Sequence, residues 1–107
     1  MYATLTTTKG TTEDMLETAR VVGEALYSWL GAIDGFEGMV LMCNEETGVT
    51  HLLSLWESRE VADRHEHARL QFRDRITATV DVEVQETSGY DVAFAELSAT
   101  SERLGRT

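Results

Sequence analysis

The sequence predicts one small α+β domain in which two helices cover a single antiparallel sheet of four strands. Three observations favour this fold class. Segments rich in β-branched and aromatic residues alternate with two segments of helical periodicity, in the order βαββαβ. The chain has 107 residues, the size of one domain, and 42% are hydrophobic, which is enough for a core. A turn over residues 44–48 joins two strands directly, as in a hairpin. This order is the ferredoxin-like, or split βαβ, arrangement.

The chain is expected to begin with a strand and a helix. Residues 2–8 are β-branched and aromatic, which favours a strand. Either Thr11 or Thr12 can cap the following helix. The acidic residues Glu13 and Asp14 would then lie in its first turn, where the helix dipole favours anions. The stripe of apolar residues at helical spacing consists of Met15, Ala19, Val22, Leu26, Trp29 and Ile33.

A hairpin is expected after this helix. The pair Asp34-Gly35 should end the helix, and residues 36–43 should form the second strand. The turn at residues 44–48 leads into a third strand over residues 49–56. Both segments are apolar on both alternating faces, so helices can cover only one side of them. Self-association is the simplest cover for the other side, which predicts a homodimer.

The second half should form a helix and a last strand. Ser58 can cap the helix, whose predicted inward stripe is Val61, His65, Ala68, Phe72 and Ile76. Valines alternate with polar residues over 80–85, as in a half-buried strand. Ser88-Gly89 interrupts this pattern, and residues 90–97 either continue the strand or bend away. Residues 1–97 are thus predicted to form one domain and residues 98–107 a polar C-terminal tail.

Composition excludes several classes of function. Nine basic residues against 19 acidic ones give a net charge of −10, which repels nucleic acid and anionic membrane surfaces. No apolar run approaches the roughly 20 residues that span a bilayer, and the first residues lack the pattern of a signal peptide, so we expect a cytoplasmic protein. Cys43 is the only cysteine, which excludes an intrachain disulfide and a multi-cysteine metal site.

Three short motifs resemble one known family. They are Gly35-Phe36-Glu37-Gly38, Thr47-Gly48 and Trp56-Glu57-Ser58-Arg59-Glu60. In this order they resemble the antibiotic-biosynthesis-monooxygenase-like family of the dimeric α+β barrel superfamily. The resemblance implies a homodimer in which two sheets pack face to face as a barrel, with a pocket between each sheet and its own helices. Relatives include cofactor-independent oxygenases of aromatic compounds and haem-degrading enzymes.

The sequence departs from the haem-degrading branch of that family. The branch has a second tryptophan where this chain has His65, and a histidine where it has Arg75. It also has an asparagine on the first strand, where Leu5 to Thr8 offer only threonine and leucine. Haem degradation of that type is therefore disfavoured.

His65 is the predicted catalytic residue. On the apolar face of a helix its imidazole could act as a general base, although a structural histidine bonded within the core is the alternative. His51 could orient a substrate or make a polar contact at the dimer interface, and Tyr90 could donate a hydrogen bond into the pocket. His65 and His67 are two apart on a helix and do not share a face, so we expect no metal. The predicted substrate-binding residues are His51, Tyr90, Trp29, Phe72 and Trp56.

Two main functions remain open. The first is a cofactor-independent oxygenase acting on a small aromatic or quinol-type molecule, with His65 as the base. The second is a non-catalytic module that binds a small apolar ligand, or another partner, with the same fold. A third hypothesis is haem binding through His65 or His51. Only the haem-binding hypothesis requires a cofactor.

Overall fold

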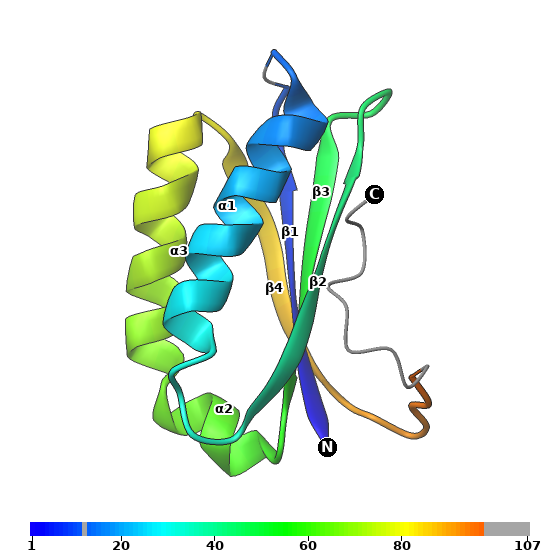
Figure 1. The fold of residues 1–107 in the computed structure, drawn as a ribbon, viewed down its shortest axis with the longest axis vertical. Coiled ribbons are helices and arrows are strands. Elements are labelled where there is room, and N and C mark those ends of the chain that lie inside the picture. The colour runs from blue at the N-terminus through cyan, green and yellow to red at the C-terminus, as the bar shows by residue number, and fades with distance from the viewer. Residues whose placement is uncertain (12, 98–107) are drawn as a thin grey trace.

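A computed structural model describes residues 1–11 and 13–97, and the predicted tail over residues 98–107 lies outside this part of the chain. The described residues have the predicted order of elements, with the second helix divided in two (Figure 1). The elements are β1 (Tyr2–Lys9), α1 (Met15–Leu30), β2 (Phe36–Asn44), β3 (Val49–Trp56), α2 (Arg59–Arg64), α3 (Glu66–Val80) and β4 (Glu83–Asp91).

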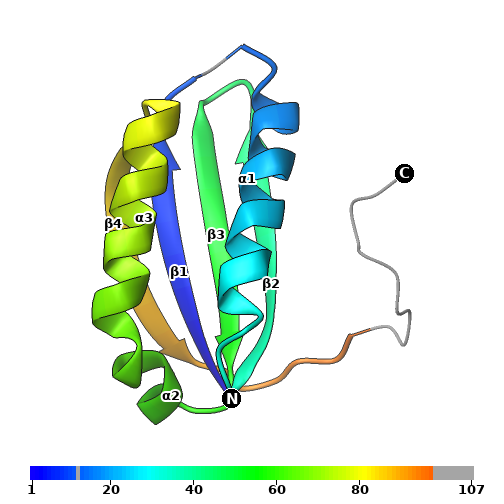
Figure 2. The same cartoon turned by 60° about the vertical axis from the view of Figure 1, so that its left-hand side comes forward.

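The four strands form one antiparallel sheet in the order β2-β3-β1-β4, which confirms the predicted ferredoxin-like fold. β3 and β1 are therefore central, while β2 and β4 are the edges. Helices α1 and α3 lie on the same side of the sheet, α1 over β2 and β3 and α3 over β1 and β4 (Figure 2). In the described part of the chain no helix covers the opposite side, which we call the open face.

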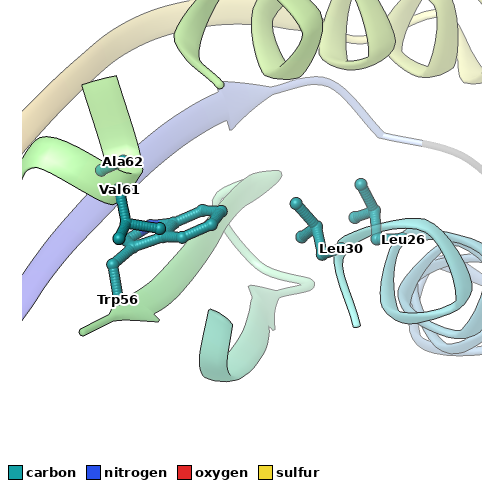
Figure 3. Close-up of a cluster of buried hydrophobic side chains, with 5 residues drawn as sticks. All are labelled: Leu26, Leu30, Trp56, Val61 and Ala62. Atoms are coloured by element: carbon teal, nitrogen blue, oxygen red, sulfur yellow. The ribbon is translucent and has the colours of Figure 1, made fainter. Parts of the chain in front are cut away.

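The core lies between α1, α2 and the end of β3. Trp56 is fully buried there with Leu26, Leu30, Val61 and Ala62 (Figure 3). The indole N–H of Trp56 donates to the Thr4 hydroxyl at 3.0 Å, so burial leaves no polar atom of the ring without a partner. The ring of Phe36 meets the indole edge-on, with 5.4 Å between centroids.

Helix α1 begins later than the predicted cap at Thr11 or Thr12 and ends earlier than its apolar stripe predicts. Asp14 takes a left-handed conformation with φ of 53°, which aspartate tolerates better than most residues, and the helix begins after it. Glu13 and Asp14 therefore precede the first turn, and Thr12 lies outside the described residues. The helix ends at Leu30, not at Asp34-Gly35, although Ile33 still packs against the core.

The second predicted helix is interrupted at His65, whose backbone (φ −106°, ψ 10°) is not helical. The Ala62 carbonyl instead accepts two bonds from the Arg69 guanidinium, at 2.8 Å from Nη2 and 3.3 Å from Nε. The interruption changes which residues of α3 face inward. Ala68 is exposed, contrary to the prediction, while Arg69 and its neighbours one turn on are partly buried.

Arg69 also covers the buried indole. Its guanidinium carbon lies 5.2 Å from the centroid of the Trp56 ring. Burial lowers the pKa of Arg69 below its ordinary value, while the nearby carboxylates of Glu66 and Asp63 oppose this shift. Arg69 therefore joins α2, α3 and the core through a single side chain.

Replacing Arg69 with methionine keeps the apolar stem and removes these bonds. The expected loss is about 2 kcal/mol in the free energy of unfolding, because a charged hydrogen bond and a cation–π contact disappear together. Urea denaturation measures it. Arg75→Met, at an exposed position of the same helix, is the matched control and should change stability by less than about 0.5 kcal/mol. Equal unfolding midpoints for the two variants would contradict this account of Arg69.

β4 is continuous through Ser88-Gly89, where the sequence predicted an interruption. Gly89 lies close to the hydroxyl end of Tyr2, so a Cβ at this position would require the Tyr2 side chain to move. Val80 ends α3 instead of beginning the strand, and Asp81 follows in a left-handed conformation. Beyond Asp91 the chain leaves the sheet.

Candidate functional site

A cavity of about 100 Å³ lies between the sheet and its helices and is partly open to solvent. We call it the helix–sheet cavity. Its walls come from β1 and β3, one residue of β2, the first three turns of α1 and the second half of α3. The lining residues are Thr6, Thr8, Gly10, Met15, Thr18, Ala19, Val22, Leu26, Leu41, Thr50, Leu52, Arg73, Ile76, Thr77, Val80 and Val82.

An aromatic stack marks one end of the cavity. Trp29, near the end of α1, lies parallel to Phe72 of α3, with 4.7 Å between ring centroids and 6° between planes. Leu26 and Ile76 lie next to this pair along their helices and contribute both to the core and to the cavity wall. The stack thus connects the two helices on the core side, and the cavity lies beyond it.

Most of the lining is apolar, and its polar groups are hydroxyls. Five threonines contribute, three from the sheet and two from the helices. Each hydroxyl can donate and accept a hydrogen bond, so the cavity can bind a carbonyl or hydroxyl group on an otherwise apolar molecule. Among the described residues, no carboxylate, imidazole or thiol lines it.

Arg73 is the one charged residue among the described lining residues. Its side chain is 25% exposed. Nη1 donates to the Thr87 hydroxyl of β4 at 2.9 Å, while Nε and Nη2 donate to Oδ1 of Asp74 at 3.0 and 2.7 Å. These bonds hold the guanidinium between α3 and the edge of the sheet.

The structure brings three of the predicted site residues together. Trp29, Phe72 and Trp56 all belong to the core region that borders the cavity, Trp56 as the fully buried centre and the other two as the stack. None of them is among the residues that line the cavity itself.

The other predicted site residues lie elsewhere. His65 sits at the junction of α2 and α3, partly buried, and does not line the cavity. Its catalytic role stays a prediction without a contact to support it. His51 lies on the open face, because its neighbours Thr50 and Leu52 line the cavity. Tyr90 also lies there, because it pairs with Ala3, which is three positions before the cavity-lining Thr6 and therefore faces away from the cavity. His67 is exposed.

His51 has a partner on the open face. Its Nδ1 lies 2.9 Å from the Thr7 hydroxyl of the neighbouring strand β1. A shallow hollow beside the hairpin turn is lined by His51 together with Met42, Cys43, Asn44, Thr47 and Val49. This placement fits the alternative role that the sequence left open, a polar contact between subunits.

Two further findings concern the described residues. No helix among them is long and apolar enough to cross a membrane. No group of three histidine, cysteine, aspartate or glutamate side chains in residues 1–11 and 13–97 is arranged to hold a metal ion.

Comparisons with known proteins identify the class of fold. The sequence matches no family model, and no curated protein matches it. A putative antibiotic biosynthesis monooxygenase from Deinococcus radiodurans has a similar structure, with a TM-score of 0.61, 15% identity, and coverage of 94% of this chain and 100% of that one. SnoaB, a cofactor-independent oxygenase from Streptomyces nogalater, has a TM-score of 0.63 and 11% sequence identity, and the match covers 88% of this chain and 95% of SnoaB.

A third similar structure is a dimeric ferredoxin-like protein from an uncultured marine organism. It has a TM-score of 0.59 and 19% identity, over 91% of this chain and 98% of that one. The chain therefore has the ferredoxin-like fold of antibiotic biosynthesis monooxygenase-like structures. This confirms, at the level of the fold, the resemblance that the sequence motifs indicated.

Proposed function

We propose that the protein takes a small aromatic or quinol-type molecule into the helix–sheet cavity and oxidises it with dioxygen, without a cofactor. The observation that carries this proposal is a mainly apolar cavity with scattered hydroxyls, in a fold shared with a cofactor-independent oxygenase over 88% of the chain. An apolar ring fits the aliphatic walls, and the threonines can bond its oxygen atoms.

In this chemistry the substrate supplies the electrons. Loss of a proton gives an anion that transfers an electron to dioxygen, and recombination forms a carbon–oxygen bond. On an anthrone-type methylene group, two hydrogens leave the carbon and one oxygen atom replaces them, while the second oxygen leaves as water. The protein's contribution is to hold the anion between the mainly apolar walls of the cavity.

The proton that leaves the substrate must pass to an acceptor. His65 does not line the cavity, and the threonine hydroxyls are too weakly basic to take its place. We propose that the proton passes to water where the helix–sheet cavity opens to solvent. His65→Ala should then retain oxygen uptake within about twofold, whereas a base contributes about 10²-fold or more. A loss of that size would restore His65 as the base.

Filling the cavity tests where the reaction takes place. Ala19 lines the cavity from α1, and Ala19→Leu adds three carbon atoms to its space. Protein-dependent oxygen uptake with anthrone- and quinol-type compounds under air should fall at least about tenfold, because the ring is displaced from its position. An oxygen electrode measures the rate.

Ala78→Leu is the matched control, because Ala78 is exposed on α3. It should leave oxygen uptake unchanged. Equal rates for the two variants would show that the cavity is not the reaction site. Absence of protein-dependent uptake with the whole panel would contradict an oxygenase.

One observation favours the second function, a non-catalytic binding module. Among the described residues the cavity lining includes no side chain that could act as a general base. Thermal stabilisation by a quinol-type compound, without oxygen uptake or a product, would support this function. Haem binding through His65 or His51 stays a hypothesis, and a hemin titration followed at the Soret band tests it.

We further propose that two copies associate through their open faces. Aliphatic residues from the three strands β1, β2 and β3 lie there, and Tyr90 of β4 adds a ring. Val40, Met42 and Tyr90 are 43%, 46% and 50% exposed in the single chain. So large an apolar face is unusual on a soluble monomer. The apolar residues of the open face are Leu5, Val40, Met42, Leu53, Leu55 and Tyr90. The dimeric ferredoxin-like neighbour supports this assembly.

A further inference from the structure

Among the described residues that line the helix–sheet cavity one is cationic, Arg73, in a chain whose net charge is −10. Sixteen described residues line the cavity, and the fifteen besides Arg73 are five threonines, one glycine and nine apolar residues, so Arg73 has no acidic neighbour among them. Its carboxylate partner, Asp74, is 65% exposed and lies outside the lining, where solvent screens it. An anion that enters the cavity would therefore meet Arg73 without opposing negative charge from the described lining residues.

The guanidinium of Arg73 also has donors to spare. It has five N–H groups in a planar fork. Its bonds within the described residues are one to Thr87 and two to Asp74, which leaves two N–H groups. Because these bonds fix the plane of the group, the remaining donors are already oriented for an incoming acceptor.

We propose that the ligand of this cavity is a small monoanion, a single aromatic ring that carries one ionised oxygen group. The oxygen group binds the guanidinium of Arg73, and the ring lies among Val22, Leu52 and Ile76. This inference rests on the proposed function, since it takes the helix–sheet cavity as the ligand site. It also gives Arg73 a part in specificity, because a neutral ring of the same shape gains no charge-assisted bond.

The same contact assists the proposed reaction. A cation beside an acidic oxygen favours its ionised form, as for any acid next to a guanidinium. Arg73 would therefore hold the substrate as the anion from which electrons pass to dioxygen, without a protein base in the cavity. Arg73 is in this sense a substrate-binding residue and not a proton acceptor.

Benzoate and benzamide test the charge preference, because they have nearly the same shape and differ in charge. Binding is followed by NMR of the methyl groups of Val22, Leu52 and Ile76, which also locates the ligand. Benzoate should bind the intact protein about tenfold more tightly than benzamide, the size expected for one charge-assisted contact that is partly exposed to solvent.

Arg73→Met should reduce this preference to less than about twofold. Arg75→Met removes the same charge from an exposed position of α3 and should keep the full preference. Arg73→Gln is a second test that retains a donor for Thr87, and it should also lose the preference. Unchanged amide spectra of the free variants establish that each one folds.

Three outcomes would overturn the inference. Equal affinities for benzoate and benzamide, with methyl shifts in the cavity, would remove the charge preference and leave the cavity as a ligand site. Loss of the preference in Arg75→Met would attribute it to overall charge. Absence of methyl shifts with either compound would contradict both this inference and the proposed cavity.

Discussion

Replacing Trp56 with alanine is expected to lower the free energy of unfolding by about 4 kcal/mol, the largest effect of any single substitution considered for this chain. The indole is fully buried and touches the core residues from α1 and α2. Its removal leaves a cavity, breaks the bond to Thr4 and takes away the ring beneath Arg69. Urea denaturation measures the loss, and Trp29 remains as the fluorescent reporter.

Two companion variants separate the contributions of Trp56. Trp56→Phe keeps most of the apolar contact and loses the hydrogen bond, so it should cost less than the alanine variant. Thr4→Val keeps the indole but leaves its N–H without an acceptor, with an expected cost of about 1–2 kcal/mol. A Trp56→Ala protein within about 1 kcal/mol of the parent would contradict the position of Trp56 at the centre of the core.

Replacing Leu53 with lysine is expected to convert a dimer into monomers. Leu53 lies on the central strand β3 and pairs with Leu5 on one side and Val40 on the other, in the middle of the open face. A lysine there would place an unpaired charge inside the interface. The expected cost is about 3 kcal/mol or more, a dissociation constant raised at least about a hundredfold. Light scattering over a dilution series measures it.

Leu16→Lys is the matched control, since Leu16 is 65% exposed on α1, away from the open face. It makes the same chemical change and should leave the dissociation constant unchanged. A Leu53→Lys protein that associates as tightly as this control would show that another surface joins the subunits.

The fold was largely predictable because its signals are local. The β-branched first strand, the apolar stripe of α1 and the turn over residues 44–48 each specify an element without reference to distant contacts. Ser58 begins α2 as predicted, and its hydroxyl accepts the Val61 amide. The order of these elements then permits few topologies.

The interruption at His65 was not predictable in the same way. Helical periodicity across residues 58–76 gives no signal of it, because the bond that accompanies the break joins Arg69 to a carbonyl seven residues earlier. Once the helix is interrupted, residues before and after it no longer share one stripe. Phe72 and Ile76 still face inward, whereas Ala68 does not, and His65 moves to the junction.

The cavity lining was missed for a related reason. Three of its five threonines lie in strands, where threonine is common, so their presence in the sequence does not by itself indicate a polar cavity wall. Arg73 belongs to a series of arginines interleaved with acids, which indicates a solvated surface. Only the three-dimensional arrangement shows that this arginine reaches Thr87 at the edge of the sheet.

Sedimentation of the intact protein at micromolar concentration tests most directly whether a second copy covers the open face. We expect a particle of twice the 11.9 kDa chain mass. A single compact species of 11.9 kDa over the whole concentration range would contradict it.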